Sequence, residues 1–247
     1  MKTDPNIDTQ KRRILAFAGK AAAFFSTVWF FSSGRVFAGF FSQHTEDIMK
    51  LPPARHKGTV SVEQAIERRR TIRSYTDKPL SPEQLSQMLW AAQGITEKGG
   101  FKRSAPSAGA LYPMDVYVVT GEHTVEKLEA GVYHYKPDQH ALERVADKDL
   151  REETARACLS QMWVATAPVS FVVTAEYERI RGKYGERGRR YAMIEAGHIG
   201  QNLFLQAQAE KLAAGIVGAF NDEHLNRVLG LPRSHEPLLV MPAGYEN

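Results

Sequence analysis

Hydrophobic spacing and capping signals divide residues 61–247 into helices and strands. Two capping boxes, in which a serine is followed three residues later by glutamine, predict helices from Ser61 to about Arg70 and from Ser81 to Gly94. Gly94 is expected to end the second helix in a left-handed conformation. Apolar residues at helical spacing predict three further helices, over 150–163, 190–212 and 222–229.

Strands are predicted where apolar residues alternate or run on without interruption. They cover 114–120, a hairpin of 132–135 and 142–145, then 168–175, 213–220 and 238–242. The run at 168–175 is apolar at nearly every position, which is typical of a central strand buried on both faces. Helices and strands that alternate irregularly, with one hairpin inserted, indicate an α+β fold with a mixed sheet.

The excess positive charge lies at the N-terminus. The chain of 247 residues has a formal net charge of +4, and residues 1–38 hold six lysines and arginines against two aspartates. Residues 39–247 are therefore neutral as a group and lack the basic excess typical of nucleic-acid binding. No nucleic-acid partner is expected.

Residues 1–38 read as a targeting segment. Arg12-Arg13 precedes a moderately apolar run over 14–31, and Val36-Phe37-Ala38 follows as a small-residue cleavage site. The arrangement resembles a twin-arginine export signal. We expect a signal peptide and a periplasmic or otherwise exported protein. A membrane anchor or a cytoplasmic protein with transient membrane contact through this segment are the alternatives. Residues 39–60 are interpreted as an extended lead-in to the domain at 61–247.

The common cofactor and catalytic motifs do not occur in the chain. There is no Gly-x-Gly-x-x-Gly after a strand, no phosphate-binding Gly-x-x-x-x-Gly-Lys loop, no His-Glu-x-x-His and no Gly-x-Ser-x-Gly. The single cysteine, Cys158, excludes an internal disulfide and is expected to be a small buried residue. Eight histidines lack metal-ligand spacing, so no metal site is expected.

Four stretches could nevertheless serve a ligand. Residues 68–75 (RRRTIRSY) offer guanidinium groups and hydroxyls to a phosphate, or form an exposed basic helix terminus. The small residues of 105–113 (APSAGALYP) and 215–220 (GIVGAF) let the backbone approach a flat ligand, or allow a turn and close packing. Lys183 and Tyr184, at a predicted loop-to-helix junction, could supply a positive charge and a proton donor, or belong to a solvated basic loop.

Taken in order, these stretches resemble the nitroreductase family of flavin enzymes, and within it the SagB-type, azoline-dehydrogenase-like branch. The matching segments are RRTIRSY (69–75), LSQMLWAAQGIT (85–96), APSAGALYPMDVYVV (105–119), GVYHY (131–135), KYGERGRRYAMIEAGHIGQNLFLQA (183–207) and VGAF (217–220). The resemblance spans about residue 61 to the C-terminus. It implies a nitroreductase-like α+β homodimer, with a mixed sheet flanked by helices and two FMN molecules in the dimer interface.

The resemblance also implies roles for individual residues. Those that would hold the FMN phosphate and ribityl chain are Arg69, Arg70, Thr71 and Arg73. Those that would line the flavin, from the partner subunit, are Pro106, Ser107, Ala108 and Gly109. Those that would approach the ring near N5 are Val217, Gly218 and Ala219. Lys183 and Tyr184 match a pair implicated in catalysis in this branch.

The expected activity is FMN-dependent oxidoreduction of a small or peptide-derived substrate. Hydride would pass between flavin N5 and the substrate, while a proton is transferred by Tyr184, or by Lys183 if partial burial and nearby arginines favour its release. Two alternatives are an NAD(P)H-dependent nitro- or quinone-reductase and a flavin-binding protein without turnover. Export would weigh against the first, because nicotinamide cofactors are not expected outside the cytoplasm.

Four other residues have a structural interpretation. Glu195 and His198 lie one turn apart on the predicted 190–212 helix and could touch, with His198 as an interface or core histidine. Trp163 and Tyr112 are interpreted as packing residues.

Overall fold

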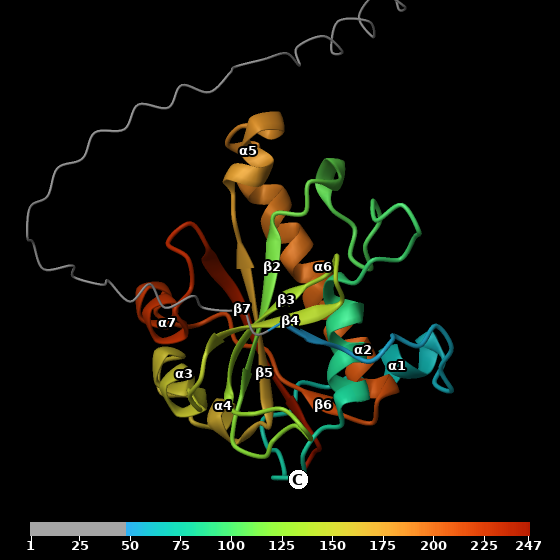
Figure 1. Cartoon of the computed structure of the whole chain (residues 1–247), viewed down its shortest axis with the longest axis vertical. Helices are drawn as coiled ribbons and strands as arrows, with labels where there is room; N and C mark the ends of the chain where they lie inside the picture. The colour runs from blue at the N-terminus through green and yellow to red at the C-terminus, as the bar shows by residue number, and fades with distance from the viewer. Residues whose placement is uncertain (1–47) are drawn as a thin grey trace, which may run out of the picture. The chain divides into compact units, whose positions relative to one another are not determined.

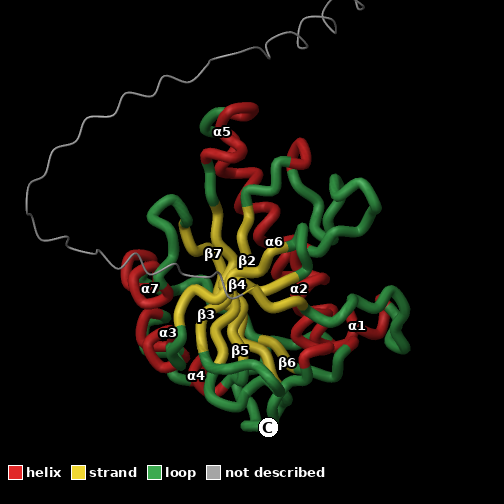
Figure 2. The backbone as a smooth tube through the Cα atoms, in the orientation of Figure 1, coloured by secondary structure: helices red, strands yellow, loops and turns green. Residues whose placement is uncertain are grey.

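The computed structural model describes residues 48–247, which form one seven-stranded sheet with helices on both faces (Figures 1 and 2). The strand order is β1-β4-β3-β2-β5-β7-β6. The strands are β1 Ile48–Lys50, β2 Met114–Thr120, β3 Gly131–Lys136, β4 Ala141–Ala146, β5 Val169–Ala175, β6 Ala213–Ala214 and β7 Glu236–Gly244. The predicted α+β class is confirmed. The sheet of residues 48–247 is antiparallel rather than mixed, because every pair of neighbouring strands is antiparallel. Parallel pairing occurs there only at isolated bridges, such as the one between Thr71 and Ala214.

Two hydrophobic cores lie on the two faces of the sheet. One contains the apolar sides of α2 and α6, including Leu89 and Leu203, and the other contains those of α3 and α7, including Ala155 and Leu225. The helices are α1 Val62–Arg68, α2 Pro82–Gln93, α3 Arg151–Ala157, α4 Trp163–Thr166, α5 Glu178–Tyr184, α6 Arg187–Ala209 and α7 Asp222–Leu229. The result is a three-layer arrangement, with the sheet between the two groups of helices (Figure 1).

Strand β5 is the central strand that its apolar run predicts. All seven of its residues are buried, between β2 on one side and β7 on the other. Phe171 and Val173 belong to one core and Val172 to the other, because successive side chains of a strand point to opposite faces. Burial on both faces explains why the run lacks a polar alternation.

Both predicted capping boxes are present. The Ser61 and Ser81 side chains each accept from the backbone N–H three residues on, and the glutamine there bonds back to the serine N–H. Gly94 is extended, at φ −63° and ψ 151°, rather than left-handed. A β-carbon on Gly94 would lie 2.3 Å from the Trp90 ring, so close packing on that indole explains the glycine.

Two predicted elements are shorter than expected. The helix predicted over 150–163 is broken into α3 and α4, because Leu159 and Ser160 between them have positive φ values. The strand predicted over 213–220 pairs only through Ala213–Ala214 and a bridge from Val217 to Val240. Cys158 is buried as predicted, and burial raises the pKa of its thiol to about 12.

The described part of the lead-in contributes to the sheet. Ile48–Lys50 form edge strand β1, which pairs with β4, and Leu51 N–H donates to the His140 carbonyl. Within residues 48–247, no helix has the length and apolar content needed to cross a membrane. The predicted export signal lies outside the described residues.

Candidate functional site

The small-residue loop that contains Gly109 lies against Lys183 and Tyr184. Gly109 has φ +64°, and a β-carbon added to it would lie 2.9 Å from both Lys183 Nζ and Tyr184 Oη. Only glycine combines that backbone conformation with so close an approach. Two of the four stretches that suggested a ligand therefore meet in space.

Lys183 and Tyr184 form the last turn of α5 rather than part of a loop, and α5 ends at Gly185. Lys183 is exposed, which corrects the expected partial burial, and its Nζ lies 5.5 Å from the centre of the Tyr184 ring. Tyr184 is half-buried and packs edge-on against Tyr191 of α6, with ring centroids 5.1 Å apart. A cation and a phenol thus stand side by side where a bound ligand can reach them.

Ion pairs fix α5 and α6 to one end of the sheet. Arg179 of α5 pairs with Asp115 in β2, 2.7 Å from Nη1 to Oδ2, and with Glu176 just after β5. Arg189 of α6 lies 2.9 Å from both carboxylate oxygens of Glu236 in β7. These charge-assisted contacts set the direction of the helix that ends in the Lys-Tyr pair.

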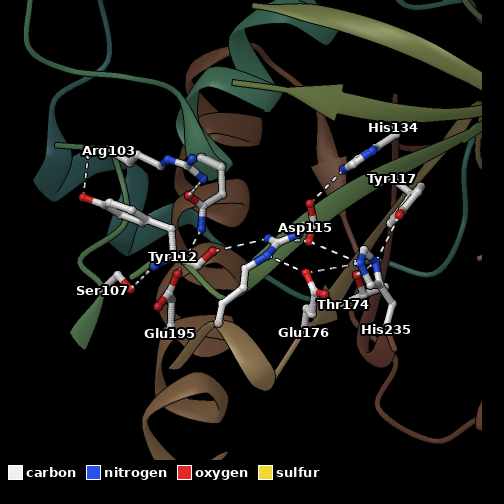
Figure 3. Close-up of polar contacts among 12 residues, drawn as sticks. Arg103, Ser107, Tyr112, Asp115, Tyr117, His134, Thr174, Glu176, Glu195 and His235 are labelled. Carbon is white, nitrogen blue, oxygen red and sulfur yellow. Dashed lines mark hydrogen bonds and ion pairs between the residues drawn. The ribbon is translucent and has the colours of Figure 1, made fainter. Parts of the chain in front are cut away.

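Two histidines complete the cluster around Asp115 (Figure 3). His134 Nε2 lies 2.8 Å from Asp115 Oδ1, and the buried His235 lies 3.7 Å from Oδ2. Burial by itself would raise the pKa of Asp115, but the hydrogen bond from His134 and the Arg179 charge together outweigh it and lower that pKa. Burial lowers the pKa of His235, which favours its neutral form. The Asp115 carboxylate is thus held ionised.

Asp115, Glu176 and His235 have the composition of a metal site. One potential ligand atom from each lies within 4.8 Å of the other two. The Arg179 guanidinium already pairs with both carboxylates, so it supplies the positive charge that a metal ion would bring. We interpret these residues as an ion-paired structural cluster.

A second buried cluster joins α6 to the small-residue loop. Glu195 is 1% exposed, and one of its oxygens accepts from Gln93 Nε2 at 3.2 Å. Gln93 Oε1 in turn accepts from Arg103 at 3.3 Å, and Ser107 Oγ accepts from Tyr112 N–H at 3.0 Å (Figure 3). Burial raises the pKa of Glu195 to about 7, against the opposing effects of Ser107, Gln93 and Arg103. The carboxyl therefore changes charge near neutral pH.

The basic segment after α1 runs beside β6. Thr71 forms a parallel bridge with Ala214, and Ile72 N–H donates to the Ala214 carbonyl at 3.0 Å. A β-carbon on Gly215 would lie 2.7 Å from both the Ile72 carbonyl oxygen and the Trp163 ring, so glycine permits this approach. The other two stretches that suggested a ligand therefore also lie side by side.

The arginines of this segment are available to an anion. Within residues 48–247, no carboxylate forms an ion pair with Arg69, Arg70 or Arg73. Arg69 lies over the Phe204 ring at 5.2 Å, Arg73 lies over the Trp163 ring at 5.6 Å, and Arg70 donates to two backbone carbonyls. Aromatic stacking leaves the edge of a guanidinium free to bind a phosphate.

The backbone that follows β6 is open to a ligand. Val217 is buried and bridges to β7, whereas Gly218 and Ala219 are exposed. A β-carbon on Gly218 would meet nothing within 4 Å, and the Ala219 carbonyl accepts from Gln161 Nε2 at 3.3 Å. A flat ligand held by the neighbouring basic segment could approach this backbone.

The Lys-Tyr pair at the end of α5 and the basic segment after α1 lie at opposite ends of α6 (Figure 1). Tyr184 contacts Tyr191 near the start of α6, and Arg69 contacts Phe204 near its end. The helical rise puts about 20 Å between Tyr191 and Phe204. Within one chain, the Lys-Tyr pair and the basic segment therefore do not meet.

Comparison with known proteins identifies the family. The model that describes the nitroreductase family matches residues 66–245. The chain belongs to the nitroreductase family. It is an oxidoreductase, in a family of flavin enzymes.

Three similar proteins illustrate its place in the nitroreductase family. Protein MJ1384 of Methanocaldococcus jannaschii, assigned to the nitroreductases, is 40% identical over 185 residues, which are 75% of this chain and 91% of that protein. The microcin B17-processing protein McbC of Escherichia coli is 30% identical over 179 residues, 70% of this chain and 66% of McbC. A Ralstonia eutropha JMP134 crystal structure, also assigned to the nitroreductases, matches with a TM-score of 0.71 at 30% identity, covering 82% of this chain and 90% of that chain.

Some residues of this nitroreductase-family site were not predicted. Glu195 bonds to Gln93 on α2 rather than to His198, which is exposed in the chain by itself. Asp115 and Arg179 gave no sequence signal of their role, because their pairing depends on strand order. A glutamate on the otherwise apolar face of the 190–212 helix was the available sign of a buried acid.

Proposed function

We propose that this chain is an FMN-dependent oxidoreductase of the SagB-type, azoline-dehydrogenase-like branch, acting on a small or peptide-derived substrate. The observation that carries the proposal is the contact of Gly109 with Lys183 Nζ and Tyr184 Oη, which unites the flavin-lining loop with the pair expected in that branch. The 30% identity with McbC supports the same branch, because that protein processes a peptide, microcin B17.

The residues present fit FMN. Arg69, Arg70, Thr71 and Arg73 would hold its phosphate and ribityl chain. The three guanidinium groups lack carboxylate partners among the described residues, and Thr71 adds a hydroxyl. The open backbone at Gly218 and Ala219, next to the buried Val217, would receive the ring edge. When bound, FMN supplies hydride acceptance or donation.

Two copies of the chain would be needed to complete each site. The basic segment and the Lys-Tyr pair are separated along α6 by about 20 Å. In a homodimer, the loop of one copy, Pro106 to Gly109, would cover the flavin whose phosphate the other copy holds. Because Gly109 contacts Lys183, the Lys-Tyr pair would enter the site with that loop.

The Lys-Tyr pair would manage the proton. The Tyr184 hydroxyl would exchange a proton with the substrate, and Lys183 places a positive charge beside the Tyr184 ring. The neighbouring Tyr191 ring fixes the orientation of Tyr184. The Arg179 ion pairs hold the helix that presents both groups.

A nitro- or quinone-reductase using NAD(P)H is the second candidate, favoured by the 40% identity with MJ1384. Purification followed by identification of the released flavin tests FMN dependence, and absence of flavin binding would overturn both candidates. Anaerobic mixing of the loaded protein with NADPH separates them, because rapid bleaching of the flavin supports the reductase. Full turnover by both Lys183→Ala and Tyr184→Phe, with flavin bound, would remove the catalytic role of the pair.

A further inference from the structure

We propose that Glu195 is a positioning residue that controls, through Ser107, how the flavin-lining loop donates hydrogen bonds to the cofactor. The inference rests on the proposed function and adds to it a control by the charge of one buried carboxyl. Glu195 touches neither Lys183 nor Tyr184 directly. Its effect would pass through the loop that faces them.

The carboxyl is enclosed by polar groups from two other segments. Gln93 of α2 donates to Oε1, and Ser107 and Arg103 belong to the segment between α2 and β2. Oε2 is buried without a partner of hydrogen-bond geometry in residues 48–247, although the Ser107 hydroxyl lies near enough to favour the ionised form. Arg103 is the charged group that faces Glu195, and its distal nitrogen bonds to Gln93 instead of forming an ion pair with the carboxyl.

The Ser107 hydroxyl has one proton to donate and two lone pairs. One lone pair accepts from Tyr112 N–H at 3.0 Å, which fixes the oxygen in place. When Glu195 is ionised, a rotation of the Ser107 hydroxyl would turn its proton toward the unpartnered carboxylate oxygen. When Glu195 is protonated, its own O–H donates to the remaining lone pair of Ser107, and the serine proton becomes available to a ligand on the other side of the loop.

The two states would bind FMN with different strength. The neutral carboxyl leaves the loop with one more donor, whereas the ionised carboxylate takes that donor away. Since burial raises the pKa of Glu195 to about 7, the change falls within the pH range of ordinary binding assays. The dissociation constant for FMN should therefore rise as pH increases through neutrality.

Titration of the flavin-free full chain with FMN, from about pH 5.5 to about pH 8.5, tests this inference, with flavin fluorescence as the readout. For the wild type we expect affinity to fall by about tenfold with increasing pH, the effect of one hydrogen bond. Glu195→Gln should keep the low-pH affinity throughout, because its amide always donates to Ser107. The FMN phosphate titrates in the same pH range with both proteins. The difference between their two pH profiles of FMN affinity therefore reports the effect of Glu195 alone.

Ser107→Ala is the second variant. It should abolish the fall in FMN affinity that Glu195 causes as pH rises, while Glu195 itself stays in place. Circular dichroism melting verifies that both variants are folded. Parallel pH profiles for the wild type, Glu195→Gln and Ser107→Ala, all with FMN bound, would overturn the role of Glu195 and leave the proposed function standing. Failure of the wild type to bind FMN at any pH would instead overturn the proposed function.

Discussion

Gly109 and Lys183 are in direct contact across the candidate site: a β-carbon on Gly109 would lie 2.9 Å from Lys183 Nζ. Gly109→Ala should therefore displace Lys183 and reduce turnover strongly, while left-handed strain costs roughly 1–2 kcal/mol of stability. Steady-state kinetics and thermal melting separate the two effects. Gly182→Ala is the matched control, because a β-carbon there meets nothing within 4 Å. Equal turnover in both variants would show that the contact is unimportant.

Arg73→Ala should purify with much less flavin. The exposed Arg73 guanidinium has no carboxylate partner in residues 48–247 and stacks on Trp163, so it is available to a phosphate. Loss of one charge-assisted bond predicts an FMN affinity about tenfold weaker or more. Flavin absorbance per mole of protein measures it. Arg68→Ala is the control, because it removes an exposed arginine that is not among the proposed phosphate-binding residues, and it should keep its flavin. An equal loss of bound flavin in the two variants would point to a general charge effect.

Co-expression of Arg73→Ala with Lys183→Ala should restore activity that neither variant has alone. If each site takes its phosphate segment from one copy and its Lys-Tyr pair from the other, every mixed dimer contains one site with both parts intact. Random pairing then gives about a quarter of wild-type turnover. Purification through two different affinity tags isolates the mixed dimers. Mixed dimers that hold flavin yet remain inactive would show that both parts come from one chain.

Asp115→Asn should destabilise the protein by roughly 2 kcal/mol at neutral pH, because Arg179 loses its buried partner. The folded pKa of Asp115 is lowered, so the charged form stabilises the fold above its ordinary pKa, and this contribution is lost as pH falls through the lowered value. The difference from the wild type should therefore shrink below about pH 4. Urea unfolding at several pH values measures it.

The control for Asp115 is Glu178→Gln, which breaks the exposed ion pair with Arg181. A surface pair of this kind contributes much less to stability than a buried pair, because water screens the two charges. Comparable losses in the two variants would mean that the Asp115 cluster is no more than another surface ion pair.

Glu195→Gln should stabilise the flavin-free protein at pH 8 and have little effect at pH 5. Burial raises the pKa of Glu195 to about 7, so the folded protein keeps a proton that the unfolded chain releases at lower pH. Stability is therefore lost as pH rises between the unfolded and folded pKa values, by on the order of 2 kcal/mol, and glutamine removes that loss. Denaturant unfolding at the two pH values provides the measurement. A variant less stable than the wild type at pH 8 would contradict it.

Local signals in the sequence were sufficient for most of the elements. The capping boxes at Ser61 and Ser81 specify helix starts through contacts three residues apart, and α7 ends at Leu229, where the 222–229 helix was predicted to end, with Gly230 after it in a left-handed conformation. Strand β2 has the predicted bounds, and β5 is central because its apolar run requires burial on both faces. Contacts a few residues apart decide the helix caps, and the unbroken apolar run marks the buried strand, so both can be recognised from the sequence alone.

Only the tertiary structure decided which distant residues meet. The strand order brings Asp115 to Glu176 and Arg179, and the packing of α2 on α6 gives Glu195 its partner Gln93 in place of the nearby His198. The backbone turn at 159–160 breaks a pattern that otherwise reads as one helix. Lys183 and Tyr184 were recognisable as a pair from the sequence. Their contact with Gly109 was not, because it depends on how α5 leaves the sheet, and no local pattern encodes that direction.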